Sequence, residues 1–424
     1  MFDDGAPPVG ALAGIRVLDL TNDLAAYSTR LLGDLGADVI RIEPPGGSPT
    51  RRTEPMVSLP ATGDPGSDGA GARAISAFEW FVNAGKRSLV LDLDTEGGNV
   101  LFERLVRTAD VLVETWSGEE AERMGFLPAD LGELNPRLVH VSVTPFGRDR
   151  PRLPVDDDDL TIMAAGGLLN LGGYPDTPPI AAYGGQSRNA ASLFAAVSAL
   201  IALHDREVSG RGRWVDVSAQ ECVAQALEDS VVTYEMTGRV RVRRGSDSAE
   251  AGTGMYPCAD GLVSMVAGRV GTLKAWRALV AWLAEEGVEG AADLQDPSWS
   301  EFTFRQTRPA IEQFTRIFER FTSTRTRLEL YQEAQRRGIA LSPVNDIAGI
   351  LSDPQLQARG FWVDVPEPGT GRAVIFPGPP YRLSRTPAIP ARPAPALGAD
   401  TASVLESIGA DAALPDALRE AGVS

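Results

Sequence analysis

Histidine and cysteine are almost absent from this chain of 424 residues, which contains two of each. His140, His204, Cys222 and Cys258 show no Cys-x-x-Cys or His-x-x-x-His spacing. A structural zinc site needs four such ligands at short spacings, so we expect no metal centre. Catalysis that depends on histidine or cysteine is disfavoured for the same reason, and so is a disulfide between the two isolated cysteines.

Long apolar runs and an excess of positive charge are also missing. The longest apolar-leaning run, residues 190–203, is shorter than the roughly 20 residues that span a bilayer. The acidic N-terminal residues do not resemble a signal peptide, so we expect a cytoplasmic protein that does not associate with membranes. The net charge of −17 predicts that nucleic acid, a polyanion, is not its partner.

Apolar strands and amphipathic helices alternate through the first third of the chain. Short β-branched runs predict the strands, and leucines at helical spacing follow the first of them. This alternation predicts an α/β fold with a Rossmann-like parallel sheet that helices cover on both faces. The predicted strands are Gly14–Leu20, Ala37–Glu43, Arg87–Leu93, Asp110–Glu114, Leu138–Val143 and Arg213–Ala219.

The pattern changes after Gly238, where a hairpin around Ala259–Gly261 is followed by helical segments. We predict a large domain that is interrupted by a smaller α+β domain. Residues 1–225 form the first part of the large domain, 226–338 form the small domain with its linkers, and 339–424 return to the large domain with a proline-rich strap. The apolar helix at residues 189–204 is expected to be buried, either in its own domain or against a partner subunit.

Two common nucleotide-binding motifs are missing from this fold class. The turn after the first strand reads LTNDLAAYS and contains no glycine, whereas a dinucleotide site needs G-x-G-x-x-G there. A Walker sequence is absent as well. Enzymes that use a nicotinamide or a nucleoside triphosphate are therefore disfavoured.

Five ordered motifs carry a family resemblance. They are LLGDLGADVIRIEPPGG, NAGKRSLVLDL, ADVLVETWSGEEAERMGF, LNPRLVHVSVTPFG and DREVSGRGRWVDVS. Together they resemble the class III CoA-transferases, the CaiB/BaiF family that includes formyl-CoA transferase, carnitine CoA-transferase and α-methylacyl-CoA racemase. The resemblance implies a Rossmann-like domain built from both chain ends, an inserted small domain and an interlocked dimer. It also implies CoA transfer between carboxylic acids, with coenzyme A thioesters as substrates and no tightly bound cofactor.

The resemblance also indicates which residues bind CoA. The phosphates of CoA require cations, and its adenine and pantetheine require apolar walls. The positions that match the family pattern are Arg51, Lys86, Arg87, Trp116 and Arg123. The alternative is that these residues belong to the scaffold and the surface, with Arg123 paired to Glu119 on its own helix.

The family's catalytic aspartate has no counterpart in this chain. In family transferases it precedes an Ala/Leu-rich helix, attacks the thioester and then carries CoA. The matching stretch, AAYGGQSRNAASLF, places Gln186, Ser187 or Arg188 at this position, and no carboxylate occurs from Thr177 to His204.

An acidic run, Asp156–Asp159, offers the other candidate for a catalytic group. Asp158 matches the position where racemases of the family have a histidine, so it is a candidate base whose pKa the neighbouring aspartates would raise. The run can equally be a solvated turn, with Asp159 capping the helix that follows.

Three functions therefore stay open. The chain is a CoA-transferase-like protein that acts on or binds acyl-CoA thioesters, and a homodimer would suit this function. Alternatively, it is a non-catalytic subunit that forms a heterodimer with a homologous subunit carrying the aspartate. The third alternative is an acyl-CoA isomerase, racemase or lyase with a non-standard base.

Overall fold

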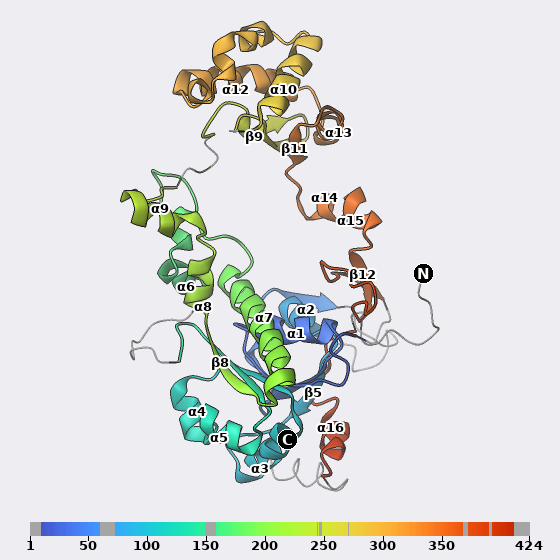
Figure 1. Ribbon diagram of the computed structural model, residues 1–424. Helices are drawn as coiled ribbons and strands as arrows, with labels where there is room; N and C mark the ends of the chain where they lie inside the picture. The colour runs from blue at the N-terminus through green and yellow to red at the C-terminus, as the bar shows by residue number, and fades with distance from the viewer. Residues whose placement is uncertain are drawn as a thin grey trace. The chain divides into compact units, whose positions relative to one another are not determined.

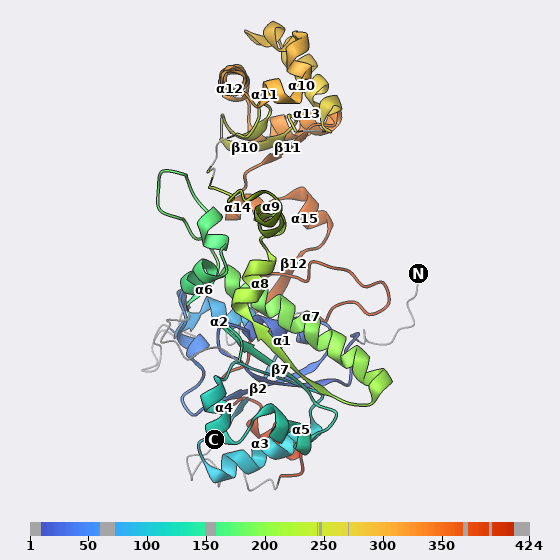
Figure 2. The same ribbon diagram turned by 60° about the vertical axis from the view of Figure 1, so that its left-hand side comes forward.

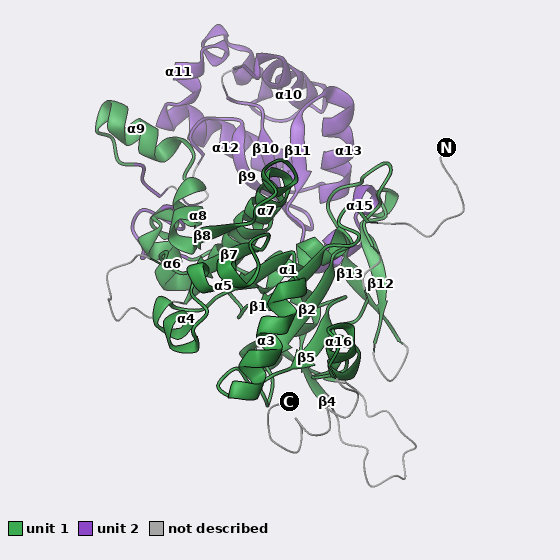
Figure 3. Cartoon of the chain, turned by 60° about the horizontal axis from the view of Figure 1, so that its bottom comes forward, with its two compact units in different colours: residues 1–170, 181–240, 357–424 green, residues 171–180, 241–356 purple. Residues whose placement is uncertain are grey.

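A computed structural model of the chain describes residues 10–59, 73–148, 158–243, 245, 248–269, 271–367, 372–389 and 392–410. The chain divides into two compact units, which Figure 3 shows in different colours. The large unit comprises residues 1–170, 181–240 and 357–424, and the small unit comprises residues 171–180 and 241–356.

These divisions fall later in the chain than the boundaries predicted at residues 225 and 338. Helix α9 (Asp229–Thr237) belongs to the large unit. Strand β11 (Ala340–Pro343) pairs with β10 (Gly261–Val266), so the small unit extends beyond residue 338. Strand pairing between distant segments decides such a boundary, and composition alone does not indicate it.

The large unit is built on a six-stranded sheet in which every neighbouring pair of strands is parallel. This confirms the predicted α/β class and each predicted strand. Figure 1 labels the two edge strands of the sheet, β5 and β8. The strand order, β5-β2-β1-β6-β7-β8, reverses direction between β1 and β6, as in a doubly wound Rossmann-like sheet. The strands are β1 Arg16–Leu20, β2 Asp38–Glu43, β5 Arg87–Val90, β6 Val111–Glu114, β7 Val139–Thr144 and β8 Arg213–Ser218.

Alternate residues of the central strands pack against different helix layers. Val17 and Val111 belong to one apolar cluster, which includes residues of the long helix α7. Leu18 and Leu112 belong to another, which includes residues of helix α3. In Figure 2, α7 lies along the sheet and α3 lies below it. The helices of this unit, besides α9, are α1 Ala26–Asp34, α2 Ala77–Val82, α3 Glu96–Thr108, α4 Gly118–Met124, α5 Pro128–Leu134, α6 Asp159–Ala165, α7 Gln186–Ser209, α8 Ala219–Gln225 and α16 Thr401–Ser407.

Helix α7 contains the segment that was predicted to be buried, and only one of its faces is buried. Small residues such as Ala191, Ala195 and Ala199 pack closely against the sheet and neighbouring helices. The opposite face exposes large apolar side chains: Leu193 51%, Phe194 44%, Val197 51% and Ile201 65%. Among the described residues, no helix is both long and apolar enough to cross a membrane.

The C-terminal part of the chain crosses the large unit mainly as irregular backbone. Ile389 N donates to Asp34 O at 3.0 Å, and Gly85 N donates to Pro393 O at 3.3 Å. These contacts attach the proline-rich segment to the last residue of α1 and to the loop before β5. Two hairpins accompany it in the large unit, β3 Met56–Leu59 with β4 Arg73–Ser76, and β12 Trp362–Pro366 with β13 Ala373–Pro377.

The small unit has an antiparallel sheet, β11-β10-β9, and a core that is rich in aromatic residues. Its first hairpin pairs Cys258 with Gly261, as the sequence predicted. Trp276 and Trp299 stack with ring centroids 5.7 Å apart inside the core. Besides β10 and β11, its strands and helices are β9 Thr253–Cys258, α10 Leu273–Glu285, α11 Phe302–Arg305, α12 Arg308–Thr322, α13 Arg327–Arg337 and α14 Ile347–Leu351, with α15 Pro354–Ala358 at the division between the units.

Candidate functional site

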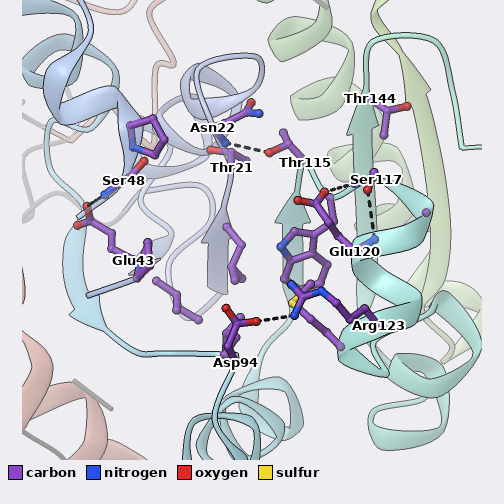
Figure 4. A pocket seen from close by; sticks show the side chains of 18 of the residues that line it. Thr21, Asn22, Glu43, Ser48, Asp94, Thr115, Ser117, Glu120, Arg123 and Thr144 are labelled. Carbon is purple, nitrogen blue, oxygen red and sulfur yellow. Dashed lines mark hydrogen bonds and ion pairs between the residues drawn. The ribbon is translucent and has the colours of Figure 1, made fainter. Parts of the chain in front are cut away.

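A pocket of about 530 Å³ lies at the carboxyl ends of the parallel strands in the large unit (Figure 4). The segments that follow β1, β2, β5, β6 and β7 all contribute to its lining. These strands flank the point where the strand order reverses, which is where open α/β sheets bind ligands. The fold therefore positions this pocket as the candidate binding site.

The wall after β6 is held by a compact aromatic contact and a helix cap. The Trp116 ring stacks on Phe126, with centroids 6.1 Å apart, and meets Phe102 edge-on at 6.0 Å. Ser117 caps helix α4, because its hydroxyl accepts from Glu120 N while Glu120 Oε2 accepts from Ser117 N at 2.7 Å. This cap fixes the start of the helix that carries Arg123 at the pocket.

Arg123 forms an ion pair at the pocket with Asp94, from the loop between β5 and α3. Its Nη1 lies 2.6 Å from Asp94 Oδ1, and Figure 4 shows the two side chains pointing toward one another. Both side chains are largely exposed, at 60% and 68%. The hydrogen bond to Asp94 raises the pKa of Arg123 above its usual value, so the guanidinium stays charged. Asp94 is thus a carboxylate partner of Arg123 that lies outside its own helix.

Glu114, at the end of β6, is fully buried and connects two walls of the pocket. Its Oε2 accepts from Trp116 N at 2.6 Å, on the wall after β6. Its Oε1 accepts from Ser142 Oγ, within β7, at 2.5 Å and from Arg148 Nη2, on the wall after β7. The same oxygen lies 2.9 Å from His140 Nε2. One carboxylate thus holds both loops in place, and His140 is part of this buried network.

Lys86, one of the predicted CoA ligands, has its side chain in the interior. Its Nζ donates to Asp19 Oδ2 and Thr29 Oγ1, both at 2.7 Å, to Asn83 Oδ1 at 2.7 Å and to Ala26 O at 2.8 Å. Burial lowers the pKa of Lys86 to about 8, and Asp19 opposes that shift. The ammonium connects the loop before β5 to β1 and α1, and it does not line the pocket.

Arg51 and Arg87 also have partners within the protein. Arg51 Nη2 donates to Glu43 Oε1 at 2.6 Å, and the Glu43 carboxylate is fully buried. Burial favours the neutral form of Glu43, but Arg51 and Arg41 outweigh it and hold its pKa below the usual value. Arg87 Nη1 lies 3.2 Å from Asp38 Oδ2. Of the five residues predicted to bind CoA, Trp116 and Arg123 line the pocket together.

The residues predicted at the catalytic position form the turn at the start of α7. Gln186 Nε2 donates to Tyr183 O at 2.7 Å. Ser187 is fully buried, and its hydroxyl donates to Asp159 Oδ1 at 2.6 Å while its N donates to the same atom at 2.9 Å. Arg188 pairs with Asp23 at 2.9 Å. Each of these side chains therefore has a partner within the protein.

At the start of α6, Asp158 and Asp159 have other roles than the sequence predicted. Asp158, the candidate base, is the N-cap of α6, since its Oδ1 accepts from Thr161 N at 2.8 Å. The predicted cap, Asp159, is instead the first residue of the helix and holds Ser187. Asp156 and Asp157 lie outside the described residues.

Sequence reasoning missed Asp94, Glu114 and Arg148. Asp94 and Glu114 follow or end predicted strands, and the carboxyl ends of parallel strands meet at one edge of the sheet. That position was a usable signal for a site. The specific partners were not visible, because Arg148 and Glu114 lie 34 positions apart in the sequence.

Comparison with known proteins identifies the family. The model of CoA-transferase family III matches residues 12–401, nearly the whole chain. The chain belongs to CoA-transferase family III. This protein is therefore class III CoA-transferase-like, and it acts on or binds acyl-CoA thioesters.

Individual relatives agree with this membership over most of their length. The chain is 34% identical to the succinyl-CoA:(R)-benzylsuccinate CoA-transferase subunit BbsE of Thauera aromatica, over 93% of both chains. It is 32% identical to the succinyl-CoA:mesaconate CoA-transferase of Haloarcula hispanica, over 95% of this chain and 97% of the relative. A CaiB/BaiF family protein from Brucella suis has a similar structure, with a TM-score of 0.80 and 25% identity, covering 95% of this chain and 100% of that one.

Proposed function

We propose that this chain is the non-catalytic subunit of a heteromeric CoA-transferase, paired with a homologous subunit that carries the catalytic aspartate. The observation that carries the proposal is the turn at the start of α7. Formation of an acyl anhydride needs a carboxylate nucleophile, and neither the amide of Gln186 nor the buried hydroxyl of Ser187 supplies one.

The carboxylates beside this turn are committed to other contacts, which supports the same proposal. Asp159 accepts two hydrogen bonds from Ser187, and Asp23 pairs with Arg188. Asp158 accepts from a backbone N–H as a helix cap, so one of its carboxylate oxygens already has a structural partner. An isomerase or lyase based on Asp158 is therefore the weaker alternative.

A partner subunit also suits the exposed face of α7. Leu193, Phe194, Val197 and Ile201 lie at helical spacing and expose apolar surface on one side of the helix. One relative at 34% identity is named as a subunit, and a succinyl-CoA–malate relative from Chloroflexus aurantiacus at 30% identity is named as an alpha subunit. We propose that this face packs against the homologous subunit, in the interlocked arrangement that the family resemblance implies.

The ligand of the pocket is, in this proposal, the CoA part of an acyl-CoA thioester. Trp116 supplies an apolar wall and Arg123 a cation for a phosphate, while Arg51, Lys86 and Arg87 support the surrounding loops. Several relatives have names that specify succinyl-CoA or succinate, so we propose succinyl-CoA as the donor and a carboxylic acid as the acceptor.

The test is to express the chain alone and together with an aspartate-bearing homologue from the same genome. Succinyl-CoA is offered with a panel of carboxylic acids, and new thioesters are measured. We expect turnover only from the complex, and loss of turnover when the partner's aspartate becomes asparagine. Rapid transfer by this chain alone, with hydroxylamine trapping a modified carboxylate on it, would overturn the proposal.

A further inference from the structure

The arginine–carboxylate pairs around the pocket differ in their burial. Arg51 with Glu43 and Arg148 with Glu114 each contain a carboxylate that is fully buried, and their arginine side chains are 19% and 5% exposed. Arg123 with Asp94 is exposed on both sides, at 60% and 68%. Every arginine among the described lining residues thus already has a carboxylate partner.

Burial decides which pair can exchange its partner for a ligand. Removing an arginine from a buried carboxylate leaves an unpaired charge in a medium of low dielectric constant, which is strongly unfavourable. Separating an exposed pair costs little, because water solvates both charges. A phosphate that enters the pocket can therefore recruit Arg123 cheaply, whereas Arg51 and Arg148 stay with their carboxylates.

The loop geometry allows this exchange through side-chain rotation alone. Asp94 N donates to Asp92 Oδ1 at 3.0 Å, so the backbone of Asp94 is held in place. The next residue, Thr95, caps α3 by accepting from Gly98 N at 3.1 Å. With the backbone fixed on both sides, the Asp94 carboxylate can turn toward solvent, where more than half of its surface already lies.

We propose that Asp94 sets the affinity of this pocket by competing with a ligand phosphate for Arg123. Binding replaces a carboxylate by a phosphate on the same guanidinium, and release restores the original ion pair. The competition weakens binding of the phosphate-bearing ligand and so favours its release. The inference depends on the proposed function in one respect, that the CoA part of the substrate binds beside Arg123.

The test measures CoA binding by calorimetry with the full chain and the variants D94N, R123A and E96Q. Glu96 is a matched control, because it is exposed, lies two positions from Asp94 and does not line the pocket. We expect D94N to bind CoA about two- to fivefold more tightly, since it loses an exposed competing charge. We expect R123A to bind more weakly and E96Q to match the unaltered protein. The gain in D94N should shrink when salt rises from about 50 to about 500 mM.

A second probe separates phosphate recognition from other effects. Pantetheine has no phosphate, so its affinity should be the same for D94N and the unaltered protein. If D94N binds CoA no better than the unaltered protein while R123A binds it less well, the proposed competition by Asp94 is wrong, but Arg123 still belongs to the CoA site. Unchanged CoA affinity in R123A would instead remove the site on which the inference rests. Equal gains in E96Q, or a gain for pantetheine, would also overturn it.

Discussion

The Lys86–Asp19 pair and the Arg123–Asp94 pair are nearly equal in length, at 2.7 and 2.6 Å, but lie in different surroundings. The first is enclosed where β1, α1 and the loop before β5 meet, with side chains 1% and 0% exposed. The second lies at the pocket, with both side chains largely exposed. The family resemblance assigned the same role to both cations, and burial separates them into a scaffold contact and a ligand-accessible one.

The largest expected effect comes from breaking the buried pair. Lys86→Met removes all four hydrogen bonds that Nζ donates and leaves the buried carboxylate of Asp19 without this partner, so the free energy of unfolding should fall by about 3–5 kcal/mol. Urea denaturation at fixed protein concentration measures this loss. The matched control is Lys274→Met, which removes the chain's other lysine, an exposed one, and should leave the unfolding midpoint in place.

The same lysine should make stability depend on pH in the alkaline range. Its pKa is about 8 in the folded protein against an ordinary value of 10.5, so the unfolded chain binds the proton more strongly between these values. The contribution of Lys86 to the free energy of unfolding should therefore rise from about pH 8 to about pH 10.5. Denaturation curves across this range should show the rise for Lys274→Met and lack it for Lys86→Met. Identical pH profiles for the two variants would contradict the assignment.

The Arg51–Glu43 pair is intermediate in burial, so breaking it should give an intermediate loss of stability. In Arg51→Met, the buried Glu43 loses its shortest contact but keeps a hydrogen bond from Ser88 Oγ at 2.8 Å. We expect the free energy of unfolding to fall by about 1–3 kcal/mol, the usual effect of losing a hydrogen bond to a charged group. The neighbouring Arg52→Met is the control, because Arg52 is exposed and its guanidinium contacts Gly46 O at 3.2 Å. A loss as large as that of Lys86→Met would mean that burial of the cation is not the deciding variable.

The smallest effect on stability is expected at the pocket. Arg123→Met removes an exposed ion pair, and such pairs contribute little to folding. Its urea midpoint should coincide with that of the unaltered protein, while its CoA affinity falls. A clear loss of stability in this variant would show that the Arg123–Asp94 pair supports the fold. The exposed pair would then not differ in role from the buried Lys86–Asp19 pair.

The elements of the large unit were predictable because their signals are local. Runs such as RVLDL in β1 and DVIRIE in β2 are rich in Val, Leu and Ile, so a short window of sequence identifies them. The alternation with helices then restricts the sheet to a parallel, doubly wound arrangement. The lack of a carboxylate at the start of α7 was equally visible, since it depends only on which residues are present.

The environment of each charged side chain depended on residues far away in the sequence. The buried Lys86 donates a hydrogen bond to Asp19, which lies 67 positions earlier in the sequence. Arg51 contacts Pro395, which lies 344 positions later. Asp158 and Asp159 are neighbours, yet one caps a helix and the other holds Ser187, 28 positions away. A window of sequence contains none of these partners, so the chemical types of the CoA-site candidates were predictable but their accessibility was not.

The sequence by itself therefore determined the family, the parallel sheet and the lack of a carboxylate from Thr177 to His204, because each follows from residue identity and local pattern. Only the tertiary structure decided that Arg123 lies at the pocket, that Lys86 lies in the interior, and that Asp94 stands beside the guanidinium. The physical reason is that the energy of a charge depends on the water and counter-ions around it. Those surroundings are assembled by long-range packing of the chain.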